Sequence, residues 1–420
     1  MKYSKYNYVY SDKGNVVLIN TFSNCIVILS ETEYENFLDK NTLPQDLKQL
    51  YKSQGFIIED DVDELEIMKF DNSYYTSHNM PRFRILTTTG CNAKCPYCYE
   101  DGAPVIVMDD LTATKVASFI KQHSDGKKSV YLEWFGGEPL TNYKVIKIIC
   151  ENLTLNHYKF ISSVVTNGLL MSRNLIGMLK DVANVEKVQV TLDGVEEKYE
   201  KIKGVARGSF QNVIENILNA ANSDITVYVR MNLGDNYEEL CELIEYLSKR
   251  IGFHYRIFYY VYPLFEKTYA FDRNTILQTI KLNDKLVECN LMKFSDLYKF
   301  SYRKTRCFAT NYNGYTIGPD GQLYNCTHLM KSEGAIGTID SYSMYNTKRL
   351  RFTALDVSDE CQSCVLYPIC KGGCRAAELG LADLNQCNMY KTCLDVVAQK
   401  LLSYYIGKEV ENNENHTREF

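Results

Sequence analysis

The 420-residue chain lacks the features that mark several large classes of protein. It has no excess of basic residues, because 47 Lys and Arg stand against 52 Asp and Glu and give a formal net charge of -5. A nucleic-acid-binding surface needs positive charge, so this balance argues against nucleic acid as a partner. No run approaches the ~20 apolar residues of a membrane span, and residues 1–6 lack the apolar core of a signal peptide. We therefore expect a soluble, cytoplasmic protein without a membrane partner.

Cysteine, by contrast, is abundant, with fifteen residues. The cytoplasm keeps thiols reduced, so metal binding explains this number better than disulfides do. Eleven of the fifteen fall in two stretches, residues 91–98 and 307–393. The other four stand among apolar neighbours and are interpreted as small core residues: Cys25, Cys150, Cys241 and Cys289.

The first stretch has the spacing Cys91-x3-Cys95-x2-Cys98. Three thiolates spaced in this way can reach three corners of one four-iron cube and leave the fourth iron open for chemistry. The loop follows an apolar, strand-like run at residues 83–87, so it is expected at the carboxyl end of a strand, where α/β folds gather their sites. Half of a zinc site and a chance grouping are the alternatives.

Between residues 83 and 261, short apolar strands alternate with amphipathic helices. Strands are expected at 83–88, 129–135, 160–166, 187–192, 226–231 and 255–261, and helices near 112–124, 142–156, 172–181, 209–221 and 237–250. Six β/α repeats predict an α/β fold with a parallel sheet, here a partial (β/α)6 TIM-type barrel with an open side. The last strand is unusually aromatic, and its inward side chains either line a substrate cavity or pack in the ordinary way.

Three further segments follow strands of this barrel: Phe-Gly-Gly-Glu-Pro-Leu at 135–140, Val-Thr-Asn-Gly at 165–168 and Thr-Leu-Asp-Gly at 191–194. Glycines allow close backbone approach, and a carboxylate accepts hydrogen bonds from an amino group. Together with the cysteine loop, these segments resemble those of the radical S-adenosylmethionine (SAM) enzymes. The resemblance implies that SAM chelates the open iron and that the reduced cluster cleaves it to a 5′-deoxyadenosyl radical, which abstracts hydrogen from a substrate.

The resemblance also assigns roles to the matching residues. Cys91, Cys95 and Cys98 bind the SAM cluster and form the predicted catalytic centre. The residues expected to contact SAM lie in the cysteine loop and at the three strand ends: Tyr97, Gly136, Gly137, Glu138, Pro139, Thr166, Asn167, Thr191 and Asp193. Glu138 and the backbone beside it are expected to bind the methionyl amine. Residues 199–203 stand where relatives often carry His-Asp and a later Arg, so no role is assigned to them.

The second group of cysteines begins with Cys307 and the segment Gly321-x4-Cys326. The pattern, which continues with Cys361, Cys364, Cys370, Cys374 and Cys387, resembles that of the SPASM domain, which in relatives carries two auxiliary four-iron clusters. By that resemblance Cys307, Cys326 and Cys374 hold the first auxiliary cluster. The second is held by four thiolates, those of Cys361, Cys364, Cys370 and Cys387. Cys374, one helical turn beyond Cys370, is expected to point to a different cube, and a pair of zinc sites is the alternative.

The first auxiliary set is one thiolate short of four. Relatives often have an additional cysteine between the first two, whereas residues 308–325 contain none. Either this cluster keeps an open iron, or Cys393 supplies the fourth thiolate. In total the resemblance implies SAM and three [4Fe-4S] clusters as cofactors, with a reducing flavodoxin or ferredoxin as a partner.

These patterns divide the chain into four units. Residues 1–70 have a strand, helix, helix, strand order that suits a winged-helix-like module. It resembles the precursor-recognition domain of peptide-modifying enzymes, in which a leader peptide adds a strand to a sheet edge, and a structural cap on the barrel is the alternative. Residues 80–300 are expected to form the radical SAM barrel, 301–405 the SPASM domain and 406–420 a disordered tail.

Radical SAM enzymes with this carboxyl-terminal domain mostly modify peptides or proteins. We expect a maturase of the sactipeptide or ranthipeptide type, which installs a crosslink, preferably a thioether, in a ribosomally made precursor peptide with a leader sequence. Sulfatase maturases, which form formylglycine, carry an Asp directly after the Cys of Gly-x4-Cys, where this chain has Thr327. Carbon-carbon crosslinking and epimerisation fit the same cysteine pattern. A non-enzymatic iron-sulfur electron-transfer or scaffold protein is the candidate from a different class, and the segment 136–138 argues against it.

Overall fold

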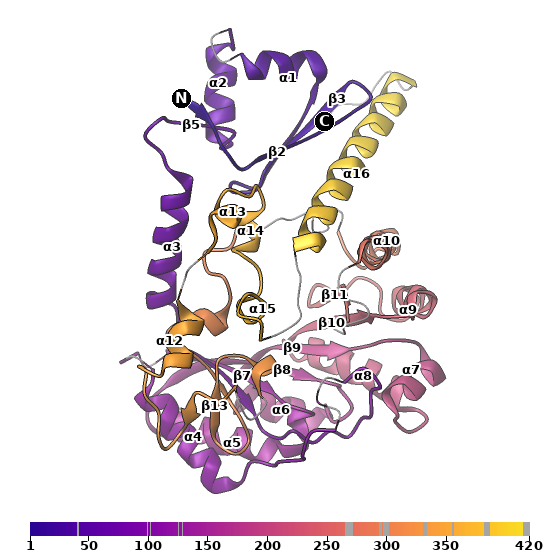
Figure 1. Cartoon of the computed structure of the whole chain (residues 1–420). Coiled ribbons are helices and arrows are strands. Elements are labelled where there is room, and N and C mark those ends of the chain that lie inside the picture. The colour runs from indigo at the N-terminus through magenta and orange to yellow at the C-terminus, as the bar shows by residue number, and fades with distance from the viewer. Residues whose placement is uncertain are drawn as a thin grey trace.

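The computed structural model of the chain has an α/β architecture (Figure 1). It describes residues 1–39, 42–98, 100, 102–124, 126, 127, 129–264, 272–293, 296, 302–330, 334–354, 357–381 and 387–414. Within these residues the strands form one sheet of nine strands, one of three and one of two. No helix in this part of the chain is both long enough and apolar enough to span a bilayer.

Six parallel strands form the main part of the large sheet, in the order in which they occur along the chain. They are β6 (Arg82–Leu86), β7 (Ser129–Phe135), β8 (Lys159–Thr166), β9 (Val185–Thr191), β10 (Thr226–Leu233) and β11 (Ile257–Pro263). The helices between them are α4 (Asp110–Gln122), α5 (Tyr143–Leu155), α6 (Arg173–Asp181), α7 (Glu196–Lys203), α8 (Ser209–Asn222) and α9 (Tyr237–Arg250). The predicted partial (β/α)6 barrel is confirmed, and its strands and the five expected helices lie within two residues of their expected bounds.

The strands divide their side chains between two faces, because successive residues of a strand point to opposite sides. On β7, Val130, Leu132 and Trp134 are fully buried in the core shared with the helices. Tyr131 and Glu133 line a cavity on the other face. The sheet therefore has one apolar face covered by helices and one mixed face that borders a cavity.

The carboxyl-terminal part of the chain extends the barrel sheet. β12 (Gly314–Ile317) pairs in parallel with β6, and the antiparallel strands β13 (Gln322–Tyr324) and β14 (Gly337–Thr338) follow. The predicted units 80–300 and 301–405 thus share one sheet. This sharing places Cys307 and Cys326, which flank β12 and β13 in the chain, next to the first barrel strand.

Short helices connect the other cysteine-rich segments. They are η2 (Phe308–Thr310), η3 (Thr327–Leu329), α12 (Thr347–Thr353), α13 (Asp359–Gln362), α14 (Tyr367–Cys370) and α15 (Arg375–Glu378). The long helix α16 (Cys387–Glu414) then packs against α10 (Arg273–Glu288). α16 includes residues 406–414, where the sequence predicts a disordered tail, and residues 415–420 lie outside the described part.

The amino-terminal unit is built on the three-stranded antiparallel sheet of β2 (Asn7–Asp12), β3 (Asn15–Asn20) and β4 (Cys25–Ser30). The helices α1 (Glu31–Leu38) and α2 (Gln45–Ser53) pack on one face of it. The small sheet of β1 (Lys2–Tyr3) and β5 (Ile57–Ile58) and the helix α3 (Glu64–His78) complete the unit. The expected strands and helices are present as β2, β3, α1, α2 and β5, whereas β1, β4 and α3 are additional.

The other face of this sheet packs against α16, which runs beside it in Figure 1. Val17 and Ile19 of β3 share an apolar cluster with Leu394, Ala398 and Leu402 of α16. All five side chains are at most 3% exposed. The first and last segments of the chain therefore form one packed layer.

Candidate active site

The loop with the first three cysteines follows β6 at the carboxyl end of the barrel strands, as expected. Cys91 and Cys98 are exposed and Cys95 is half-buried. Although the residue as a whole is exposed, partial burial of its sulfur raises the pKa of the Cys91 thiol, and the charges of Glu138, Cys95 and Cys98 add to this rise. The structure thus gathers the three thiols in one place, where thiolates repel one another unless a cation binds them.

Two glycines bring the segment after β7 against this cysteine loop. Gly137 N donates to Thr88 O at 3.0 Å, and Glu138 N donates to Gly90 O at 2.9 Å. A Cβ atom on Gly137 would lie 2.3 Å from Gly90 O, and one on Gly136, where φ is +127°, would lie 2.1 Å from Thr88 O. The two glycines are needed because one backbone packs directly on the other.

Glu138 is fully buried beneath this contact. Its Oε1 accepts hydrogen bonds from Leu140 N at 3.0 Å and Thr166 Oγ1 at 2.8 Å, and its Oε2 accepts one from Asn167 N at 2.7 Å. Burial raises the pKa of this carboxyl to about 7, although the hydrogen bonds favour the ionised form. These bonds show that Glu138 braces the ends of β7 and β8, and its expected contact with the SAM amine stays a prediction.

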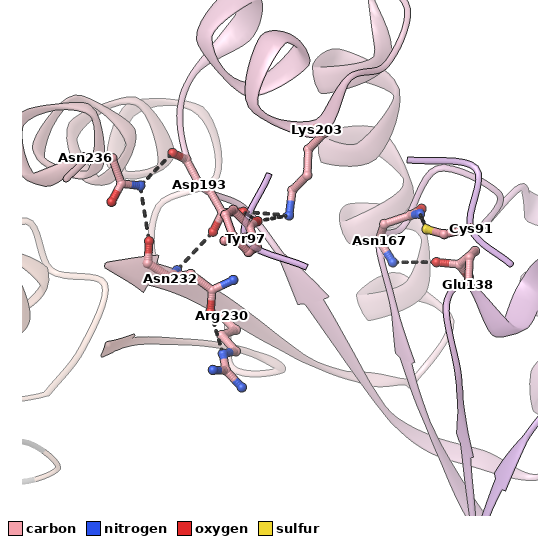
Figure 2. A network of polar contacts seen from close by, with 9 residues as sticks. All are labelled: Cys91, Tyr97, Glu138, Asn167, Asp193, Lys203, Arg230, Asn232 and Asn236. Carbon is pink, nitrogen blue, oxygen red and sulfur yellow. Dashed lines mark hydrogen bonds and ion pairs between the residues drawn. The ribbon is translucent and has the colours of Figure 1, made fainter. Parts of the chain in front are cut away.

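Asn167 connects the end of β8 to the first cysteine. Its Nδ2 donates to Asn92 Oδ1 at 2.7 Å. The same Nδ2 lies 3.8 Å from Cys91 Sγ, a contact that is drawn in Figure 2. Pro139 is buried at the start of η1 (Pro139–Asn142) and accepts a hydrogen bond from Thr87 Oγ1 at its carbonyl, at 3.0 Å. Asn167 and Pro139, which are both expected to contact SAM, therefore lie in the segments that pack against the cysteine loop.

A buried ion pair holds the other side of the loop (Figure 2). Lys203 Nζ lies 2.5 Å from Asp193 Oδ2, and the two side chains are 3% and 0% exposed. The Tyr97 hydroxyl donates to Asp193 Oδ2 and accepts from Lys203 Nζ at 2.7 Å. Asn232 N donates to the other carboxylate oxygen of Asp193 at 3.0 Å. Asp193 thus joins β9, β10, α7 and the cysteine loop, while Thr191 lies half-buried at the end of β9.

Lys203 is the site residue that the sequence interpretation left without a role. It ends α7, and its carbonyl accepts a hydrogen bond from Lys94 N at 2.7 Å. Gly204 follows with φ at +61°, and a Cβ atom there would lie 3.0 Å from Lys94 Cβ. The sequence offered one indication of this role, which is the position of Lys203. It is the last residue of the segment 199–203, where relatives often carry His-Asp and a later Arg.

The structure also brings together the three cysteines expected at the first auxiliary cluster. Burial raises the pKa of the Cys326 thiol, and the charges of Cys307 and Cys374 raise it further. Cys326 and Cys374 pack against the same apolar cluster, which consists of Ala309, Leu329, Phe352 and Ala376. The Arg306 guanidinium donates to the carbonyls of Gly373 and Gly372 at 2.7 and 2.6 Å, which holds the chain before Cys307 against the chain before Cys374.

The second auxiliary set forms another group. Burial raises the pKa of the Cys370 thiol, and the charges of Cys387 and Cys361 contribute to the rise. Cys364 and Cys370 pack against the apolar cluster between the amino-terminal sheet and α16. Within the described chain, no three His, Cys, Asp or Glu side chains are arranged to hold a single metal ion.

Lys371 tests whether this second group suits an anionic cluster. The residue is 3% exposed, and its Nζ has no hydrogen-bond partner among the described residues. The ammonium lies over the rings of Tyr302 and Tyr367, at 4.5 and 5.3 Å from their centroids. Burial lowers the pKa of Lys371 to about 8, and the charge of Asp71 opposes this fall. A cube bound by four thiolates is anionic and would favour the charged ammonium further, so the cysteine set that includes Cys370 fits such a group.

The chain between Cys370 and Cys374 differs from the expected helical turn. α14 ends at Cys370 and α15 begins after Cys374, and the φ angles of Lys371, Gly372 and Gly373 are +53°, +80° and +72°. Consecutive glycines permit this left-handed turn. The separation of the two thiols is therefore made by a backbone reversal and not by helix geometry, which corrects the sequence interpretation.

Cys393 lies in a different environment from the first auxiliary set. It packs on α16 against Ile276 and Ile280 of α10 and near Tyr262. Burial alone raises the pKa of its thiol to about 11. Cys326 and Cys374 belong to a separate apolar cluster, so the packing groups Cys393 with α10 and not with them.

A cavity of about 800 Å³ occupies the face of the barrel opposite the helices. Its lining comes from β7, β8, β9, β10 and β11 and includes Glu133, Gln189, Tyr228, Phe258 and Tyr260. The Tyr260 hydroxyl donates to Gln189 Oε1 at 2.8 Å. The aromatic side chains of the last strand therefore line a cavity, and their contact with a substrate stays a prediction.

Comparison with known proteins agrees with this arrangement. The sequence model of the Radical SAM superfamily matches residues 85–247. A serine-type anaerobic sulfatase-maturating enzyme of Klebsiella aerogenes is 23% identical over 349 residues, which cover 73% of this chain and 83% of that protein. A probable GTP 3',8-cyclase of Methanosarcina mazei is 29% identical over 179 residues, and the match spans 40% of this chain and 51% of the cyclase.

Two solved structures share the fold over most of the chain. Native anSMEcpe with bound AdoMet superposes with a TM-score of 0.61 at 20% identity and covers 80% of this chain and 100% of its own. Streptococcus suis SuiB bound to S-adenosylmethionine has a TM-score of 0.51 at 15% identity and covers 92% of this chain and 99% of its own. The barrel, the cysteine loop at its strand ends and the family match lead to one conclusion: residues 85–247 form a radical SAM domain, and the chain that carries it is an enzyme.

Proposed function

We propose that this enzyme is a peptide maturase that installs a crosslink, preferably a thioether, in a ribosomally made precursor peptide. Cys91, Cys95 and Cys98 hold the cluster that binds SAM, and a bound cluster supplies the electron for cleavage of SAM to the 5′-deoxyadenosyl radical. The relationship to a sulfatase-maturating enzyme supports a peptide or protein substrate. A further solved structure with this fold, at a TM-score of 0.58, is anSMEcpe with bound AdoMet and the Cp18Cys peptide.

The observation that carries the thioether proposal is that Cys393 packs in a different apolar cluster from Cys326 and Cys374. If Cys307, Cys326 and Cys374 hold the first auxiliary cluster, the cluster would lack a fourth protein thiolate. A substrate Cys can bind there as a thiolate, since metal binding removes the thiol proton. The sulfur is then held beside the carbon from which the adenosyl radical takes hydrogen.

Formylglycine formation is the second candidate, and Thr327 argues against it. Thr327 follows Cys326 directly, and its hydroxyl accepts a hydrogen bond from Arg84 Nη1 at 3.4 Å. A threonine hydroxyl bound by a guanidinium has no tendency to accept a proton from the substrate. Sulfatase maturases have a carboxylate base directly after the Cys of Gly-x4-Cys, whereas this chain has the neutral Thr327 at that position.

The amino-terminal unit is proposed to bind the leader sequence of the precursor. β4 pairs only with β3 among the described strands, so its outer edge offers backbone groups to an added strand. A cytoplasmic flavodoxin or ferredoxin is the proposed source of electrons for the SAM cluster.

The decisive experiment uses anaerobically reconstituted enzyme, SAM, a chemical reductant and a Cys-containing peptide encoded beside the gene. A thioether product is lighter by two hydrogens, because one hydrogen atom passes to 5′-deoxyadenosine, the thiol loses a proton and one electron leaves through the auxiliary site. The expected result is this mass change and a peptide-dependent change in the auxiliary-cluster spectra, both absent when the peptide Cys is replaced by Ser. Loss of the substrate sulfur would instead identify formylglycine formation.

A further inference from the structure

Arg84 places a positive charge beside the first auxiliary cysteine set. Its Nη1 donates to Thr327 Oγ1 at 3.4 Å, and its guanidinium lies 4.6 Å from the centroid of the Phe308 ring. Thr327 directly follows Cys326, and Phe308 directly follows Cys307. One side chain of the barrel therefore contacts the neighbours of two expected cluster ligands.

The position of this guanidinium is fixed from several sides. Arg84 Nε donates to Glu133 Oε2 at 2.6 Å, and the ring centroid of Phe135 lies 5.1 Å away. The backbone of Arg84 lies opposite Thr316 of β12, which carries the chain from Cys307 toward Cys326. The side chain is 17% exposed, so little water screens its charge.

The charge is not neutralised by its partner. Glu133 also pairs with Arg82, whose Nη2 lies 3.1 Å from Oε1. Two guanidinium groups thus share one carboxylate, and the group keeps an excess positive charge. Because Arg84 contacts Thr327 and Phe308, this excess positive charge lies beside the residues that directly follow Cys326 and Cys307.

An iron-sulfur cluster becomes more negative by one charge when it is reduced, and its potential depends on nearby charge. We propose that Arg84 raises the reduction potential of the first auxiliary cluster, so that this cluster can take up the electron released when the substrate radical is oxidised. The inference rests on the proposed cluster assignment. It gives the Arg84 to Glu133 ion pair a function beyond barrel stability.

The test uses the full-length chain with Cys91→Ala, Cys95→Ala and Cys98→Ala, so that only the two auxiliary clusters contribute to the signal. Electron paramagnetic resonance is followed during a redox titration with dithionite as reductant. Arg84→Met should lower the midpoint potential of one cluster by at least about 59 mV, equivalent to a tenfold change in the equilibrium constant for one-electron reduction. The other cluster should keep its potential.

A variant that removes a positive charge and one that removes a negative charge should shift the potential in opposite directions. Disturbed packing has no reason to produce this difference. Glu133→Gln removes the neighbouring negative charge and should raise the potential of the same cluster. Arg84→Lys keeps the positive charge, so its potential should lie close to that of the unmodified protein and above that of Arg84→Met. Lys115→Met is the control, because Lys115 forms an exposed ion pair with Asp340 at 2.8 Å. Unchanged potentials in Arg84→Met, or a shift of the same sign in Glu133→Gln, would overturn the role of Arg84 and leave the proposed function intact. Zinc in place of iron in the triple variant would overturn the cluster assignment itself.

Discussion

Lys203 Nζ and Asp193 Oδ2 lie 2.5 Å apart in a pair that is almost completely buried. Asp193 lies two residues after the end of β9, and Lys203 is the last residue of α7. Both contact Tyr97, which lies between the second and third cysteines. The ion pair therefore connects barrel stability with the shape of the cysteine loop.

Lys203→Met should destabilise the protein by roughly 3 kcal/mol, because it leaves the Asp193 carboxylate buried without its cation. Tyr97 should also lose its anchor, so the variant should retain less of the SAM cluster. Chemical unfolding and the iron content measure the two effects. Lys201→Met is the control on the same helix, because Lys201 is exposed, and the interpretation fails if both variants lose stability equally.

Glu138 predicts a dependence of stability on pH. Burial raises the pKa of this carboxyl from 4.5 to about 7, so the folded state binds a proton that the unfolded state releases. The contribution of Glu138 to stability is complete below pH 4.5 and falls by about 3 kcal/mol as the pH rises to 7. Glu138→Gln should lack this decline. The fluorescence of Trp134, the one tryptophan of the chain, reports unfolding of the cluster-free protein, and parallel pH profiles would contradict the prediction.

Gly137→Ala should abolish 5′-deoxyadenosine formation. The added Cβ would lie 2.3 Å from Gly90 O and 2.6 Å from Thr89 O, and neither backbone can move without displacing the cysteine loop. Gly177→Ala in α6 is the control, because nothing lies within 4 Å of its Cβ. That variant should be fully active and more stable by up to about 1 kcal/mol, since alanine favours a helix.

Cys393→Ala should leave the iron content of reconstituted enzyme near twelve, the number for three four-iron clusters. Cys326→Ala should reduce it to about eight, because Cys326 belongs to the first auxiliary set. Iron analysis and Mössbauer spectra distinguish the two variants. If Cys393→Ala loses a cluster, Cys393 supplies the fourth thiolate of the first auxiliary cluster. The thioether proposal then loses its basis.

Leu394→Ala should cost about 2 to 5 kcal/mol, because Leu394 is 1% exposed between Val17, Ile19 and the rest of the layer around α16. The loss should loosen the amino-terminal unit, which limited proteolysis of residues 1–70 would detect. Gln399→Ala is the exposed control on α16. Unchanged proteolysis in Leu394→Ala would show that the amino-terminal unit is stable without this helix.

The sequence by itself determined the barrel and the grouping of the cysteines. The strands and helices between residues 82 and 263 follow local periodicity, which is set by burial of one face of each element. β4 was missed because its residues pack on α1 and α2 on one face and on α16 on the other. Such a strand is continuously apolar and has no alternation to detect.

Only the tertiary structure decided which distant groups meet. The pairing of β12 with β6, the contact of Tyr97 with Asp193 and the contact of Arg84 with Thr327 join residues far apart in the chain. Local pattern carries no information about such contacts, because they depend on how complete elements pack. The same reason applies to Cys393, whose spacing after Cys387 allows a ligand role, whereas packing against Ile276 and Ile280 places it with α10.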